Sequence, residues 1–220
     1  MPRGKRKITK KELLKKPDEF ITFSNRSYNW IRMHLRPVLW VVSGIILMAA
    51  LYLAYGAYQN YQERLAHEAY FSAYPVTDSG QKIKKLEDLV ANYPRTKGAA
   101  SARVTLGHLY YQKGESAKAI AAYQGALDRM GFPANIRIMI QESLAYAYEQ
   151  KGDLPQAAKF LSEITLTKST LIKEDAFLAL ARVYQKMGKT GEAKATYEKF
   201  LKSYPKSAYA QMVKDRLNRP

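Results

Sequence analysis

The sequence predicts an all-α protein, with one membrane-spanning helix near the N-terminus followed by a solenoid of paired helices. An uncharged run at residues 38–58 lies inside a chain whose formal net charge is +17. Beyond that run, small and aromatic residues recur three times at fixed offsets that fit helices. No stretch alternates apolar and polar residues as a half-buried strand does, so the predicted fold contains helices alone.

The uncharged run has the length of a membrane span. A helix rises about 1.5 Å per residue, so a helix of this length covers about 30 Å, the thickness of a bilayer's hydrocarbon core. A soluble helix would need only one apolar side, and we therefore predict a transmembrane helix at residues 37–62. A cleaved signal peptide is the alternative, because Ala54 and Gly56 are small residues at cleavage-site spacing. The long preceding segment fits an uncleaved anchor better.

Charge on the two sides of this run predicts its orientation. Residues 1–36 hold 11 Lys or Arg against three Asp or Glu. Residues 59–80 hold one basic residue, Arg64, against three acidic ones. By the positive-inside rule the N-terminus stays in the cytoplasm and the rest of the chain lies across the membrane.

Residues 1–36 form a basic cytoplasmic segment. Thr9 and Glu12 have capping-box spacing, so we expect a short helix that ends before Pro17. A second, amphipathic helix would follow in the membrane interface and join the span through Pro37. Its apolar side would carry Phe20, Phe23, Trp30, Ile31 and Leu35.

Anionic membrane lipids are the partner that we predict for this basic segment, since each basic residue near a membrane surface adds about 1 kcal/mol of attraction. Nucleic acid is the alternative, but no nucleic-acid-binding fold accompanies the charge.

Past the span, three segments share one pattern: Leu with Gly or Ala, then Tyr, Gly, Ala, and Tyr or Leu. The first tyrosines, Tyr110, Tyr148 and Tyr184, lie 38 and 36 residues apart. The glycines are expected to end the first helix of each pair in a left-handed conformation. They are Gly114, Gly152 and Gly188. The small residues that would let paired helices approach closely are Gly107, Ala119, Ala145, Ala157, Ala181 and Ala193.

These segments resemble the tetratricopeptide repeat, a helix–turn–helix unit that stacks into a solenoid. The position that usually holds Trp instead holds Arg103, Gln141 and Phe177. The predicted domain covers residues 63–220, with a degenerate repeat at about 63–96, repeats at about 100–133, 138–171 and 174–207, and a capping helix at 208–219.

Candidate catalytic chemistry is sparse. The chain has no cysteine, and its three histidines, His34, His67 and His108, show no metal-ligand spacing. No phosphate-binding glycine loop and no Gly-x-Ser-x-Gly motif occurs. We therefore predict neither enzymatic activity nor a cofactor.

The resemblance implies a binding surface for proteins. In this repeat class the outward residues of each first helix line a concave groove, which suits an extended peptide or a partner helix. The alternative is that these residues are ordinary solvated helix faces. By offset, the candidate groove residues are Val104, His108, Tyr111, Gln112, Glu142, Tyr146, Glu149, Gln150, Leu178, Arg182, Gln185 and Lys186.

The order of basic segment, single span and repeats resembles the bacterial ancillary SecYEG-translocon subunit family, which shares its repeat domain with periplasmic cell-division coordinators. This resemblance implies an inner-membrane protein with a periplasmic repeat domain that links newly secreted chains or translocon subunits to chaperones. A scaffold for division or outer-membrane biogenesis is the alternative. An organelle receptor with cytosolic repeats would need the opposite orientation.

Overall fold

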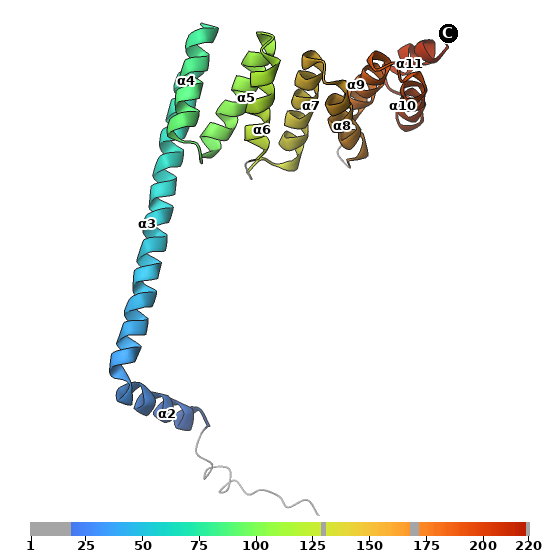
Figure 1. Cartoon of the computed structure of the whole chain (residues 1–220). Coiled ribbons are helices and arrows are strands. Elements are labelled where there is room, and N and C mark those ends of the chain that lie inside the picture. Colours follow the sequence, from blue (N-terminus) through green and yellow to red (C-terminus); the bar gives the residue numbers. More distant parts are fainter. Residues whose placement is uncertain (1–18, 129–130, 168–171, 219–220) are drawn as a thin grey trace, which may run out of the picture. The chain divides into compact units, whose positions relative to one another are not determined.

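The computed structural model describes residues 19–128, 131–167 and 172–218, and the regular elements within these ranges are ten α-helices (Figure 1). The all-α prediction is therefore confirmed. The helix expected between Thr9 and Pro17 lies outside the described residues. The chain divides into two compact units, residues 1–58 and 59–220.

The first unit contains α2 (Glu19–Met33) and the first part of α3 (Leu35–Ala73). The backbone turns at His34, whose amide donates to the carbonyl oxygens of Trp30 and Ile31 at 3.1 Å each. Pro37 is therefore not the joint that the sequence indicated. It lies in the first turn of α3, where the missing N–H of a proline leaves no helical hydrogen bond unmade.

Helix α3 has the length and composition of a helix that could cross a membrane. It runs for 39 residues, and an 18-residue window within it has a mean hydropathy of 2.2 with none of its surface buried. The helix does not stop at residue 62. Its C-terminal part belongs to the second unit, where Ala66 and Ala73 are buried in the same core cluster as Leu86 of the following helix.

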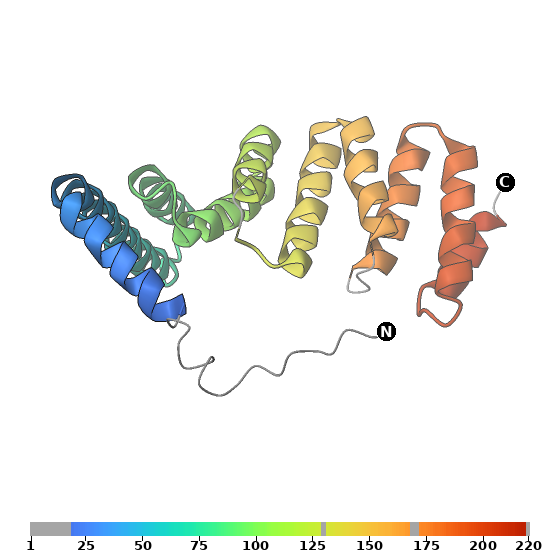
Figure 2. The same ribbon diagram turned by 90° about the horizontal axis from the view of Figure 1, so that it is seen from below.

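The second unit is a stack of antiparallel helices. Each helix from α4 to α10 packs against the next one in the chain, and α11 packs on α10 (Figures 1 and 2). The helices are α4 (Ser79–Asn92), α5 (Lys97–Gln112), α6 (Ser116–Leu127), α7 (Ala134–Lys151), α8 (Leu154–Leu166), α9 (Lys173–Lys186), α10 (Thr190–Ser203) and α11 (Ala210–Leu217).

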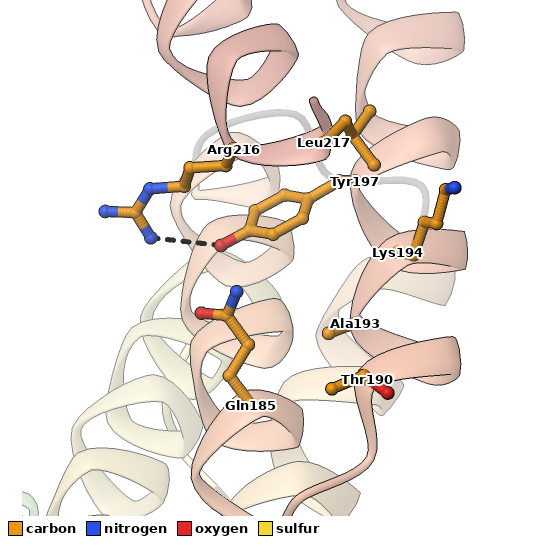
Figure 3. A pocket seen from close by; sticks show the side chains of 7 residues that line it. All are labelled: Gln185, Thr190, Ala193, Lys194, Tyr197, Arg216 and Leu217. Atoms are coloured by element: carbon orange, nitrogen blue, oxygen red, sulfur yellow. Dashed lines mark hydrogen bonds between the residues drawn. The ribbon is translucent and has the colours of Figure 1, made fainter. Parts of the chain in front are cut away.

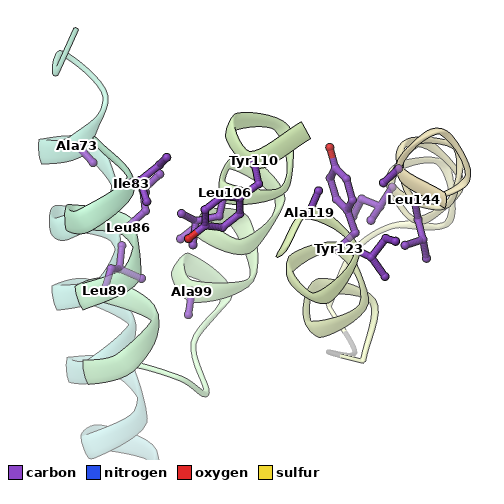
Figure 4. Packing of buried hydrophobic residues seen from close by; sticks show 14 of the residues in the cluster. Ala73, Ile83, Leu86, Leu89, Ala99, Leu106, Tyr110, Ala119, Tyr123 and Leu144 are labelled. Carbon is purple, nitrogen blue, oxygen red and sulfur yellow. The ribbon is translucent and has the colours of Figure 1, made fainter. Parts of the chain in front are cut away.

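The core of this unit follows the repeat pattern. The alanines at the small positions are at most 2 % exposed, and a Cβ on Gly107 would overlap the ring of Tyr123. One cluster of buried residues runs continuously from the end of α3 to α7, and includes Leu106, Tyr123 and Leu144 (Figure 4). Close helix approach therefore depends on residues without large side chains at these points.

The turns within the pairs also agree with the sequence. Gly114, Gly152 and Gly188 have φ angles of +77°, +87° and +74°, which L side chains rarely adopt. The capping helix is shorter than predicted. It begins at Ala210, because the Ser207 hydroxyl accepts the Tyr209 amide at 3.2 Å and holds residues 204–209 in turns.

Candidate protein-interaction face

The twelve candidate residues lie on α5, α7 and α9, the first helices of the three repeats, and we call this surface the first-helix face. Gln150 joins α7 to α5, since its amide nitrogen donates to the Tyr111 carbonyl oxygen at 3.2 Å. Arg182 and Lys186 join α9 to α7 through Glu149. The three helices are thus held edge to edge by polar contacts between residues more than 30 positions apart.

Glu149 is the centre of these contacts. Arg182 donates to both of its carboxylate oxygens, from Nε at 3.1 Å and Nη2 at 2.9 Å, and Lys186 lies 2.8 Å away. Burial alone would raise the pKa of Glu149, but the hydrogen bonds and positive charges of the two cations outweigh it, and the pKa is lowered. The carboxylate is therefore ionised and fixed at neutral pH.

A second carboxylate on α7 has the opposite surroundings. Burial, together with the negative charge of Asp175, raises the pKa of Glu142, although a hydrogen bond from Tyr146 opposes this. That bond measures 3.1 Å, and the Arg182 guanidinium carbon lies 5.9 Å from the centroid of the Tyr146 ring. Glu142, Tyr146, Glu149 and Arg182 therefore form one connected group, extended by Lys186.

His108 contributes an imidazole ring on α5. Its Nδ1 lies 2.8 Å from the hydroxyl oxygen of Tyr123, and the two rings meet edge to face. The residue as a whole is exposed, but partial burial of its imidazole lowers its pKa. Burial also raises the pKa of Tyr123 to about 12. At neutral pH both groups are uncharged, and His108 is the one of the two that a partner can reach, because Tyr123 is buried.

The remaining candidates do not form a continuous row. Val104 and Leu178 are half-buried and pack against the core clusters. Gln112 is exposed, whereas Gln185 faces a different space near the C-terminal end of the stack. The first-helix face therefore consists of the connected polar group on α7 and α9 and, separate from it, the exposed side chains of His108 and Gln112 on α5.

A pocket of about 470 Å³, which was not predicted from the sequence, lies between α9, α10 and α11 (Figure 3). The signal that could have indicated it is charge, since residues 173–220 hold 11 Lys or Arg against five Asp or Glu. Its lining residues are Gln185, Thr190, Ala193, Lys194, Tyr197, Arg216 and Leu217.

The described residues form no group that could hold a metal ion. Among them no three His, Asp or Glu side chains gather as metal ligands would, and the whole sequence lacks cysteine. The polar groups that the repeats bring together are suited to hydrogen bonds and ion pairs with another polypeptide.

Solved structures share this fold. A Podosopora anserina protein with nearly identical TPR-like repeats aligns with a TM-score of 0.52 and 19 % identity, over 72 % of this chain and 82 % of that one. A tetratricopeptide repeat protein from Parabacteroides merdae aligns with a TM-score of 0.57 and 17 % identity, over 71 % and 59 %. No curated protein matches the sequence. The sequence profile of the tetratricopeptide repeat-like domain family matches residues 30–219, so the chain belongs to this family.

Proposed function

We propose that this protein is a membrane-anchored periplasmic factor that binds other proteins through its first-helix face. In this proposal it acts beside the secretion translocon of a bacterial inner membrane and passes newly secreted chains to chaperones. Tetratricopeptide repeat-like domains are suited to protein–protein interaction, and the proposal specifies which surface and which partners. It assigns no catalytic step to the chain.

The observation that carries the proposal is the connected group on α7 and α9. Arg182 and Lys186 are each about half exposed, yet Glu149 holds both in place. Side chains that are already ordered lose less conformational entropy when a partner binds. The tyrosine ring beside them adds the kind of aromatic contact area in which protein interfaces are rich.

The membrane part of the proposal rests on α3 and on the charge around it. The helix is long and apolar enough to cross a bilayer, and the excess of Lys and Arg precedes it. The first 16 residues carry eight basic side chains, which would hold anionic lipid headgroups on the cytoplasmic side.

Site-specific photocrosslinking in living cells tests the binding surface. A photoreactive amino acid would replace His108 or Gln112 on the first-helix face. For comparison it would replace Lys159, an exposed residue of the second helix α8. We expect translocon subunits and periplasmic chaperones to crosslink from positions 108 and 112 but not from 159, as identified by mass spectrometry of the C-terminally tagged protein.

Two other results would redirect the proposal. Equal crosslinking from all three positions would remove the first-helix face as the binding surface. Selective crosslinking to division or outer-membrane assembly proteins would replace the translocon role with that of a scaffold for another envelope machine.

A further inference from the structure

Successive repeats are joined by a recurring polar contact. It occurs between α5 and α7 and between α7 and α9, and its position is counted from the repeat tyrosines Tyr110, Tyr148 and Tyr184. The residue two positions after the tyrosine of one helix contacts the residue one position after the tyrosine of the preceding first helix, at its backbone carbonyl in one case and its carboxylate in the other. Gln150 reaches the Tyr111 carbonyl oxygen at 3.2 Å, and also accepts the Ser116 hydroxyl at 2.8 Å. Lys186 reaches Glu149 at 2.8 Å.

The last repeat carries the residues that, at the equivalent positions of an internal repeat, contact the repeat that follows. By offset, Gln185 corresponds to Tyr111, and Thr190 corresponds to Ser116. The next first-helix position is occupied by α11, which has eight residues, whereas α5, α7 and α9 have 16, 18 and 14. The pocket of about 470 Å³ opens beside α11 and is lined by Gln185 and Thr190. The pocket therefore corresponds to the space that, beside each internal repeat, is filled by the full-length first helix of the following repeat.

The charges around this pocket select for an anion. Lys194 and Arg216 are its charged lining residues, and both are exposed. Lys194 forms no ion pair with any residue in the described ranges, not even with Glu198 one turn along α10. Arg216 donates from Nη1 to the Tyr197 hydroxyl at 3.0 Å (Figure 3), which orients the guanidinium and leaves its other N–H groups available.

The surrounding chain has the same sign of charge. Residues 173–220 carry a net +6, from 11 basic and five acidic residues. Residues 59–172, although more than twice as long, carry a net +3, from 14 and 11. Six of the nine net positive charges of the second unit therefore belong to residues 173–220, the segment that contains every residue lining the pocket, and they would attract an acidic partner and speed its association.

We propose that this pocket receives a carboxylate side chain from an acidic segment of a partner protein. Arg216 and Lys194 supply the positive charge. The Thr190 hydroxyl can donate to the carboxylate, as the Ser116 hydroxyl donates to Gln150 within the stack, and the side-chain amide of Gln185 can donate as well. This binding site goes beyond the first-helix face and gives the chemistry of a partner that docks at the end of the solenoid.

Fluorescence anisotropy with the full chain in nonionic detergent micelles tests the proposal. The probe is a labelled 13-residue peptide of Glu, Ala and Leu, with Glu at every third or fourth position, and its partner peptide has Gln in place of every Glu. At 150 mM NaCl, which weakens diffuse attraction between exposed charges, we expect the Glu peptide to bind at least tenfold more tightly than the Gln peptide.

Three variants locate the binding. Lys194→Gln and Arg216→Gln should each weaken binding of the Glu peptide at least fivefold. Lys199→Gln removes the same charge from an exposed position of the same helix outside the pocket, and should change binding less than twofold. Lys194 is exposed and has no ion-pair partner among the described residues, so its replacement should leave the helical circular dichroism signal unchanged.

The proposal is overturned if the two peptides bind equally, or if Lys194→Gln weakens binding no more than Lys199→Gln. The second result would mean that the peptide binds diffuse charge, such as the basic N-terminal segment. If the peptide test fails while positions 108 and 112 still crosslink to partners, only the pocket is rejected. If the peptide binds in the pocket but positions 108 and 112 do not crosslink, only the first-helix face is rejected.

Discussion

At the scale of single residues, two carboxylates on one helix show how local surroundings set opposite roles. Glu142 and Glu149 lie about two turns apart on α7. Two cations outweigh the burial of Glu149 and lower its pKa, whereas burial and Asp175 raise the pKa of Glu142. At neutral pH the charge on Glu149 therefore stabilises the fold, and a charge on Glu142 opposes it.

Replacing Glu149 with Gln should lower the free energy of unfolding at pH 7 by about 1 kcal/mol, because half-exposed ion pairs each contribute less than 1 kcal/mol. The stabilisation is present above the ordinary Glu pKa of 4.5 and is lost as pH falls through the lower folded value. Thermal melts followed by circular dichroism should therefore differ between wild type and variant at pH 7, and the difference should shrink as the pH falls below 4.5. A difference that did not shrink on acidification would contradict the ion-pair explanation.

Glu142→Gln is the matched change on the same helix. A raised folded pKa means that ionisation of Glu142 opposes folding once the pH rises through that value. Gln keeps an oxygen that can accept the Tyr146 hydroxyl and removes the charge. We expect the same melts at pH 7 to show unchanged or higher stability, and a loss like that of Glu149→Gln would mean that Glu142 is favourably paired.

At the scale of elements, the turns within each helical pair depend on backbone conformation. Gly152 has a φ of +87°, so Gly152→Ala should destabilise the fold by about 1–2 kcal/mol. Gly191 lies inside α10 with open space where the methyl group of an alanine would lie, so Gly191→Ala should stabilise by about 0.5–1 kcal/mol. Thermal melts of the two variants should shift in opposite directions, and shifts of the same sign would contradict this account.

The junction between α3 and α5 depends on one side chain. Both carboxylate oxygens of Glu63 lie 2.9 Å from the Lys97 amide nitrogen, so α3 caps the first turn of α5. Glu63→Ala should cost about 0.5–2 kcal/mol and speed hydrogen exchange of the amides that begin α5. Glu68→Ala, at an exposed position of α3, is the control, and equal exchange in the two variants would exclude a capping role.

At the scale of the whole molecule, orientation across the membrane is the property on which the proposed function depends. The chain has no cysteine, so single cysteines can report it. A membrane-impermeant maleimide should label Ser203→Cys in cells whose outer membrane is permeabilised, and should label Ser24→Cys only after the inner membrane is broken. Both positions are exposed. The reverse pattern would place the repeats in the cytoplasm and reject the periplasmic role.

Much of this fold could be predicted from the sequence because its signals are local. The apolar run of α3, the periodic small residues and the glycines at left-handed turns are each determined within one helix or one turn. Boundaries were less accurate: Pro37 did not mark the start of α3, and the capping helix begins only at Ala210. Both boundaries depend on individual hydrogen bonds of His34 and Ser207, which the residue types at these positions permit but do not require.

The sequence by itself determined the all-α class, the single long apolar helix and the register of the three repeats, because periodic patterns specify helices and their buried faces. Only the tertiary structure decided that Glu149 holds Arg182, and that Gln185 shares a pocket with Lys194 and Arg216. Some of these partners lie more than 30 positions apart in the sequence. Whether their side chains meet depends on how closely and at what angle successive helices stack, which no single helix specifies.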